Sequence, residues 1–170
     1  MGNMPDADLK LVVAEIRKID PNGLCAVDLL RDTFDQLYDW PSTGRFRWEQ
    51  LARIEKRGFG PIFEMNLQRE FKFKDGVDVN IQISGIDVAC VCSRTMGQWM
   101  IPPEAIMHIC MLVWARDDVT PNWSMGFLRV FDNYLTSGED GEGGTFLNKT
   151  GCDNIVWIFK DSNFPSNVVF

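Results

Sequence analysis

The chain has 170 residues, 45% of them hydrophobic, which suits one globular domain spanning residues 1–170 with a sizeable core. Its formal net charge of −7 excludes indiscriminate binding to nucleic acid, because such binding depends on neutralising phosphates. No apolar run reaches the roughly 18 residues that a membrane span needs, and the N-terminus lacks a secretory signal, so we expect a cytoplasmic protein without membrane contact.

Hydrophobic residues recur at helical spacing in the first half of the chain. The spacing predicts helices over 6–19, 25–38, 46–57 and 61–73, with a loop at 40–44. Asp6 or Asp8 is a candidate N-cap of the first helix, and Gly58 and Gly60 separate the last two.

The pattern changes to period two after Asp75 and Gly76, which is typical of a β-hairpin. A continuous apolar run further on has the length of a buried central strand. The predicted strands are 79–83, 86–91, 107–115, 125–131 and 154–159, and 137–144 is predicted to be a flexible acidic loop. Helices followed by a largely β half indicate an α/β or α+β class.

The cysteines form an odd and scattered set, and free buried thiols are the ordinary expectation for such a set in a reducing compartment. They are Cys25, Cys90, Cys92, Cys110 and Cys152. A metal site that combines Cys90, Cys92, His108 and Cys110 is the alternative, although the spacing differs from that of zinc knuckles.

Charge is distributed unevenly along the chain. The segment from Arg45 to Lys74 carries eight basic and four acidic residues, a net +4, which leaves −11 for the remainder. This segment could contact a nucleic acid at one place, or it could form a solvated helix face of mixed charge.

The hairpin matches the strands on which a metal-dependent nuclease carries an acid, followed by an acid-x-lysine pair. Residues i and i+2 of a strand share one face, so such a pair points both groups at one phosphate, where carboxylates hold Mg²⁺. The corresponding positions hold Asn80, Ala89 and Val91. None of these three side chains carries a charge.

Several long segments identify a family resemblance. They are LLRDTFDQLYD (29–39), TGRFRWEQL (43–51), FEMNLQREFKFKDG (63–76) and WMIPPEAIMHICMLVWA (99–115). The chain resembles the endonuclease domain of NaeI-type type II restriction endonucleases, members of the PD-(D/E)XK nuclease superfamily, over about residues 8–135. The resemblance implies an α/β restriction-endonuclease-like fold, with N-terminal helices followed by a mixed β-sheet core.

The family's catalytic residues can be carried over position by position. The resemblance places the helix glutamate on Glu64, the two strand aspartates on Asn80 and Ala89, and the lysine on Val91. Only Glu64 is retained, so we expect no ordinary family-type cleavage and no cofactor.

Two replacements for the lost residues remain open. Asp87 could act as a migrated acid, with Asp78 for Asn80 and Arg94 for the lysine, and Mg²⁺ would then be the cofactor of an active endonuclease. Alternatively, Asp87 supports the turn and Glu64 pairs with Arg69 or a lysine.

Three functions follow from these patterns. The first is a catalytically degenerate nuclease domain that binds DNA or a partner protein, the second an active nuclease using Glu64 and Asp87, and the third a structural subunit of a larger assembly. The candidate DNA contacts are Arg45, Arg47, Arg53, Lys56, Arg94 and Gln98, with Trp99 as a further contact or a packing residue. The resemblance also implies a homodimer, and the family's second, DNA-binding domain is expected to be absent.

Overall fold

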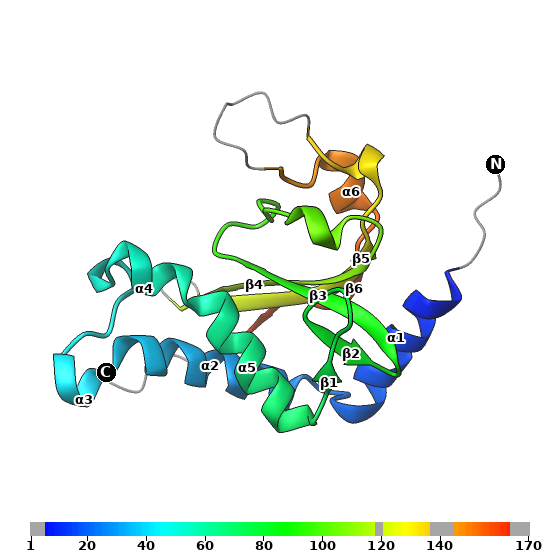
Figure 1. The fold of residues 1–170 in the computed structure, drawn as a ribbon. Helices are drawn as coiled ribbons and strands as arrows, with labels where there is room; N and C mark the ends of the chain where they lie inside the picture. Colours follow the sequence, from blue (N-terminus) through cyan, green and yellow to red (C-terminus); the bar gives the residue numbers. More distant parts are fainter. Residues whose placement is uncertain (1–5, 118–120, 137–144, 164–170) are drawn as a thin grey trace.

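The computed structural model describes residues 6–117, 121–136 and 145–163, and in it a mixed sheet lies between two covering layers (Figure 1). The helices are α1 (Ala7–Ile19), α2 (Leu24–Tyr38), α3 (Trp40–Thr43), α4 (Arg53–Arg57), α5 (Phe59–Phe71) and α6 (Lys149–Asp153). Short 3₁₀ turns occupy Trp48–Gln50, Pro103–Ala105 and Asp132–Tyr134. No described helix is long and apolar enough to cross a bilayer.

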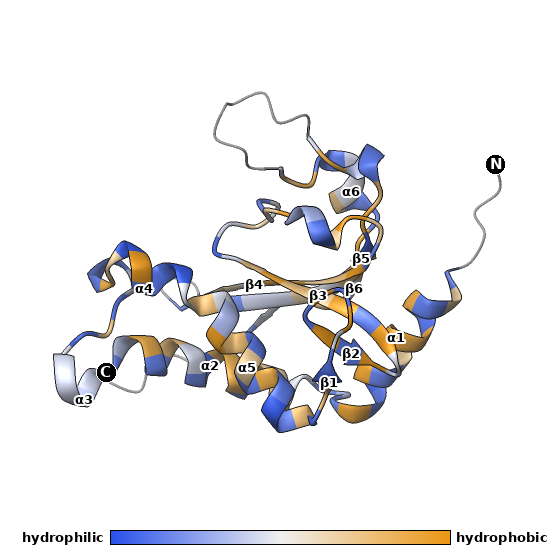
Figure 2. Ribbon diagram, viewed as in Figure 1, coloured by the Kyte–Doolittle hydropathy of each residue, from blue (hydrophilic) through white to orange (hydrophobic). Residues whose placement is uncertain are grey.

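The three long helices confirm the predictions from periodicity to within two residues at each end. Asp6 caps α1, because its Oδ1 accepts a hydrogen bond from the amide of Leu9 at 3.0 Å. Apolar residues recur along α1, α2 and α5 between hydrophilic ones (Figure 2). Their buried members pack together against one face of the sheet and form the larger core cluster.

The region between α2 and α5 differs from the predictions. The expected helix over 46–57 is wrong, because Leu51 and Ala52 are extended and separate the Trp48–Gln50 turn from α4. The Gln50 side chain accepts hydrogen bonds from the amides of Phe46 and Arg47 at 2.8 and 2.9 Å, which caps the start of the Trp48–Gln50 turn. The expected loop at 40–44 contains the helical turn α3.

The sheet contains the strands β1 (Lys74–Asp75), β2 (Ile81–Ile83), β3 (Ile86–Ser93), β4 (Ile109–Arg116), β5 (Asn122–Arg129) and β6 (Val156–Asn163). They lie in sequence order, and every neighbouring pair is antiparallel except β3 and β4, which are parallel. The predicted strands are confirmed with shifted ends, and the predicted acidic loop at 137–144 lies outside the described residues.

The parallel pairing requires a crossover from the end of β3 to the start of β4. This connection, residues 94–108, covers the sheet face opposite the long helices. Trp99 is its fully buried anchor, and its Nε1 donates to the carbonyl of Val113 at 3.0 Å. Trp99 therefore packs in the second core cluster, and the interpretation of this residue as a DNA or partner contact is wrong.

Candidate functional site

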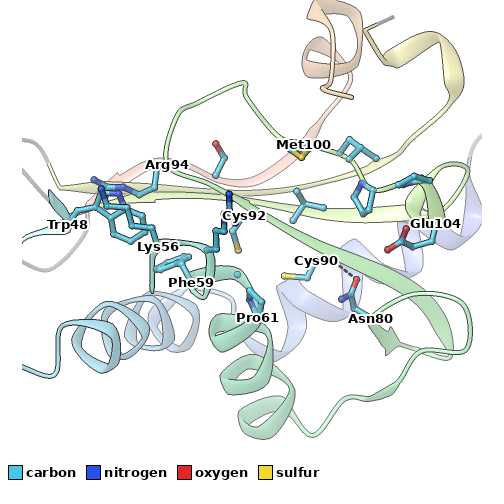
Figure 3. A pocket seen from close by; sticks show the side chains of 17 residues that line it. Trp48, Lys56, Phe59, Pro61, Asn80, Cys90, Cys92, Arg94, Met100 and Glu104 are labelled. Atoms are coloured by element: carbon cyan, nitrogen blue, oxygen red, sulfur yellow. Dashed lines mark hydrogen bonds between the residues drawn. The ribbon is translucent and has the colours of Figure 1, made fainter. Parts of the chain in front are cut away.

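A cleft of about 810 Å³ runs along the edge of β3 (Figure 3). Its existence follows from the shortness of β2, since the β2–β3 pairing ends at Ile81 opposite Val88. Beyond Val88, no strand among the described residues covers this side of β3. The residues around α4 and the start of α5 form one wall of the cleft, and residues 100–104 form the other.

Glu64 and Asn80 meet beside this open edge. The Asn80 Nδ2 donates to Glu64 Oε2 at 2.9 Å, and its Oδ1 accepts from the amide of Cys90 at 3.2 Å. Burial raises the pKa of Glu64, and the Asn80 hydrogen bond opposes that rise in part. In the described part of the chain Glu64 makes no ion pair, so the expected pairing with Arg69 is not formed.

Ala89 and Val91 lie on the opposite face of β3 from the long helices. Their exposed fractions are 1% and 8%, and they pack in the second cluster with Trp99 and Leu112. Val91 also lines the cleft. The family positions thus offer one carboxylate and one amide. This donor set does not fit Mg²⁺, which is held in proteins by carboxylates and water.

Asp87 holds the loop that precedes β2. Its two oxygens accept hydrogen bonds from the amides of Val77 and Asp78, at distances down to 2.6 Å, and from Gln82 Nε2 at 3.2 Å. The backbone hydrogen bond from Asp78 is the main reason why the pKa of Asp87 is lowered. These hydrogen bonds give the carboxylate a local role in the loop before β2, rather than at the β2–β3 turn.

Asp78, Asp87 and His108 form a convergent group whose possible ligand atoms lie within 4.8 Å of one another. His108 Nε2 lies 3.6 Å from Asp78 Oδ2. Glu64 is not part of this group. The sequence spacing did not point to it, because the crossover alone brings His108 to the loop before β2.

The cysteines do not form the metal site considered from their spacing. Cys110 lies in the cluster with Ala89, whereas Cys90 and Cys92 pack toward the helices on the other face of the sheet. Hydrogen bonding with Cys92 and burial hold the pKa of the Cys90 thiol well above its usual range, and burial raises the pKa of Cys110 to about 12. Protonated thiols are poor metal ligands, and all five cysteines are free.

The candidate DNA contacts fall into two groups. Arg45 is held at the end of α2, since its guanidinium donates to Glu55 at 2.6 Å and to the Leu37 carbonyl at 3.0 Å. Arg47 and Arg53 are exposed, and Lys56 lines the cleft together with Arg57, which the sequence interpretation missed. Gln98 is exposed and lies outside the cleft lining.

Arg94 also lines the cleft, but within a buried charged network. Its guanidinium lies over the Trp48 ring, 4.5 Å from the centroid, and 3.9 Å from Asp117 Oδ1. Asp117 also accepts from Arg31 at 3.2 Å and from Tyr38 at 2.7 Å. No sequence pattern indicates this network, because its members come from α2, β3 and the end of β4.

Helices followed by a mixed sheet, with a cleft at the open edge of β3, define a restriction-endonuclease-like fold. Residues 10–170 match the family model of restriction endonuclease NaeI, so the chain belongs to this family. It is 44% identical over 131 residues to the type II restriction enzyme NaeI of Lentzea aerocolonigenes. The match covers 77% of this chain and 41% of that enzyme, so the chain spans about two fifths of the relative's length.

Proposed function

We propose that this protein binds DNA along the cleft side and does not perform metal-dependent cleavage of the usual family type. One observation carries the proposal. Cations line the open edge of β3, while buried Ala89 and Val91 stand where the family resemblance places an acid and a lysine.

The cations beside the cleft support DNA binding. Arg47 directly precedes the Trp48–Gln50 turn, and Arg53, Lys56 and Arg57 lie on α4. None of these four residues forms an ion pair within the described residues. Such side chains contact phosphates, which position a protein on DNA without specifying a sequence. Residues 45–74 carry a net charge of +4 and the rest of the chain −11, so the attraction to a polyanion is local to this segment.

The positions around Glu64 support the absence of cleavage. Asn80 keeps an oxygen, but that oxygen accepts from the backbone of β3. Ala89 and Val91 provide neither a metal ligand nor a cation. Removing residues that act together in catalysis typically costs several orders of magnitude in rate.

Incubation with plasmid DNA and Mg²⁺ or Mn²⁺ tests the absence of cleavage. We expect no nicking or linearisation above the level of an E64A variant. Cleavage that E64A abolishes would overturn the proposal.

The salt dependence of DNA affinity tests the binding surface. Each lost phosphate contact should reduce the slope of log affinity against log salt by about 0.9. The triple variant R53A/K56A/R57A should therefore show a shallower slope, whereas R17A/K18A, at the end of α1, should not. Binding without salt dependence would contradict the DNA part of the proposal.

A second candidate function is an active metal-dependent nuclease with a displaced site. The convergence of Asp78, Asp87 and His108 favours this function. The hydrogen bonds that Asp87 already accepts from the amides of Val77 and Asp78 oppose it, because they compete with a metal ion for the same oxygens. Under this alternative D78N and H108A would abolish metal-dependent cleavage and E64Q would not.

A further inference from the structure

We infer that the cleft accepts a single unstacked nucleotide, so that the protein prefers DNA with an unpaired base to intact duplex. This inference rests on the proposed DNA binding and specifies its substrate class. It arises from the order in which cationic, apolar and hydrogen-bonding groups follow one another along the cleft.

One end of the cleft is cationic and aromatic. Lys56, Arg94 and the Trp48 ring come together there (Figure 3), with Arg57 in the same lining. Arg94 lies 4.5 Å from the Trp48 centroid. This end has the charge that a nucleotide's phosphate requires.

The middle of the cleft is apolar. Pro61 comes from one wall, Met100 and Pro102 from the other, and Val91 from β3. A phosphate in this part would lose water without gaining a partner, which is unfavourable. A flat base gains from such walls, and the volume of about 810 Å³ lies within the range of pockets that hold one small ligand.

The far end offers hydrogen-bonding groups. Asn80 and Glu104 are found there (Figure 3), and a carboxylate can accept from the exocyclic amine of adenine or cytosine. The strand edge adds backbone groups. The Cys90 amide points to Asn80, and because amides two residues apart on a strand point the same way, the Cys92 amide faces the cleft.

Affinity for two labelled DNAs of the same sequence tests the inference, one a perfect duplex and the other carrying a single-nucleotide bulge. Burial of the unpaired base against the apolar walls predicts about tenfold tighter binding to the bulged DNA. Met100 is exposed at the rim, so M100W can fill the cleft without disturbing the core. We expect M100W to lose the preference for the bulged DNA.

M96W is the matched control, because Met96 lies on the same crossover but outside the cleft lining. This variant should retain the preference. Equal affinity of the wild type for both DNAs, or a preference that survives in M100W, would overturn the inference and leave the proposed function standing. Failure to bind either DNA would overturn both.

Discussion

At the scale of single residues, the Asn80 amide occupies a place that only an amide can fill. It donates to Glu64 on α5 and accepts from the backbone of β3, so it joins the helix to the strand edge. An aspartate could still accept from β3, but it could not donate to Glu64. Restoring the family's acid at position 80 would therefore place its carboxylate next to that of Glu64, and the two negative charges would repel each other.

We expect N80D to lower the free energy of unfolding by about 1–3 kcal/mol, because Glu64 loses its donor and gains a like charge. Urea denaturation with and without Mg²⁺ measures the effect. Mg²⁺ should recover part of the loss in N80D, since two carboxylates can share a cation. The control N80A loses both hydrogen bonds of Asn80 without adding charge, and a response of N80A to Mg²⁺ would contradict the explanation.

The raised pKa of Glu64 predicts a pH dependence of stability. The folded protein holds the Glu64 proton more tightly than the unfolded chain, so stability from this group falls as pH rises from the ordinary value of 4.5 through the raised pKa. The side-chain amide introduced by E64Q would still accept from Asn80 without this penalty. Relative to E64Q, the wild type should become less stable between about pH 4 and pH 7 in urea denaturation. A relative gain would refute the assignment.

At the scale of elements, one face of β3 packs entirely in the second core cluster. Restoring the family's acid and lysine at Ala89 and Val91 on this face should therefore lower the stability of the protein. We expect A89D to lower the free energy of unfolding by about 3–5 kcal/mol, since it places an unpaired charge against the second core cluster. The substitution V91K should cost less, because position 91 borders the cleft and a long side chain can extend into it.

Chemical denaturation measures both changes. A52D is a suitable control for A89D, because Ala52 is exposed at the start of α4. Comparable losses in A89D and A52D would show that Ala89 does not lie in an apolar environment.

Periodicity predicted α1, α2, α5 and the hairpin, because each buries one regular apolar face. It failed at 46–57, where the Gln50 side chain satisfies two amides and Leu51 becomes buried in an extended segment. The family resemblance placed Glu64 and Asn80, which do meet. It could not show that Arg45 is held by Glu55, since such pairings depend on tertiary packing.

At the scale of the whole molecule, Asp117 connects parts that are distant in sequence. It bonds to Arg31 and Tyr38 on α2 and lies near Arg94 at the end of β3. Its side chain is 4% exposed, so the charges compensate one another in a dry environment. The network holds the cationic end of the cleft against the helical layer.

We expect D117A to lower the free energy of unfolding by about 3–5 kcal/mol, because Arg94 and Arg31 lose the buried carboxylate that they share. D35A is the matched control, since Asp35 pairs with the same Arg31 but is 42% exposed, and it should cost about 0.3–0.5 kcal/mol. Urea denaturation distinguishes the two outcomes. Similar small losses in both variants would show that Asp117 does not connect the layers.

The open edge of β3 has a consequence for the behaviour of many copies together. A strand edge without a partner is a template on which the edge of another chain can form a continued sheet. Lys56 and Arg57 stand on one side of this edge, and Pro102 and Pro103 on the other. Like charges on Lys56 and Arg57 repel a second copy at this edge. The cations beside the cleft that attract a polyanion therefore also oppose edge-to-edge aggregation of the protein.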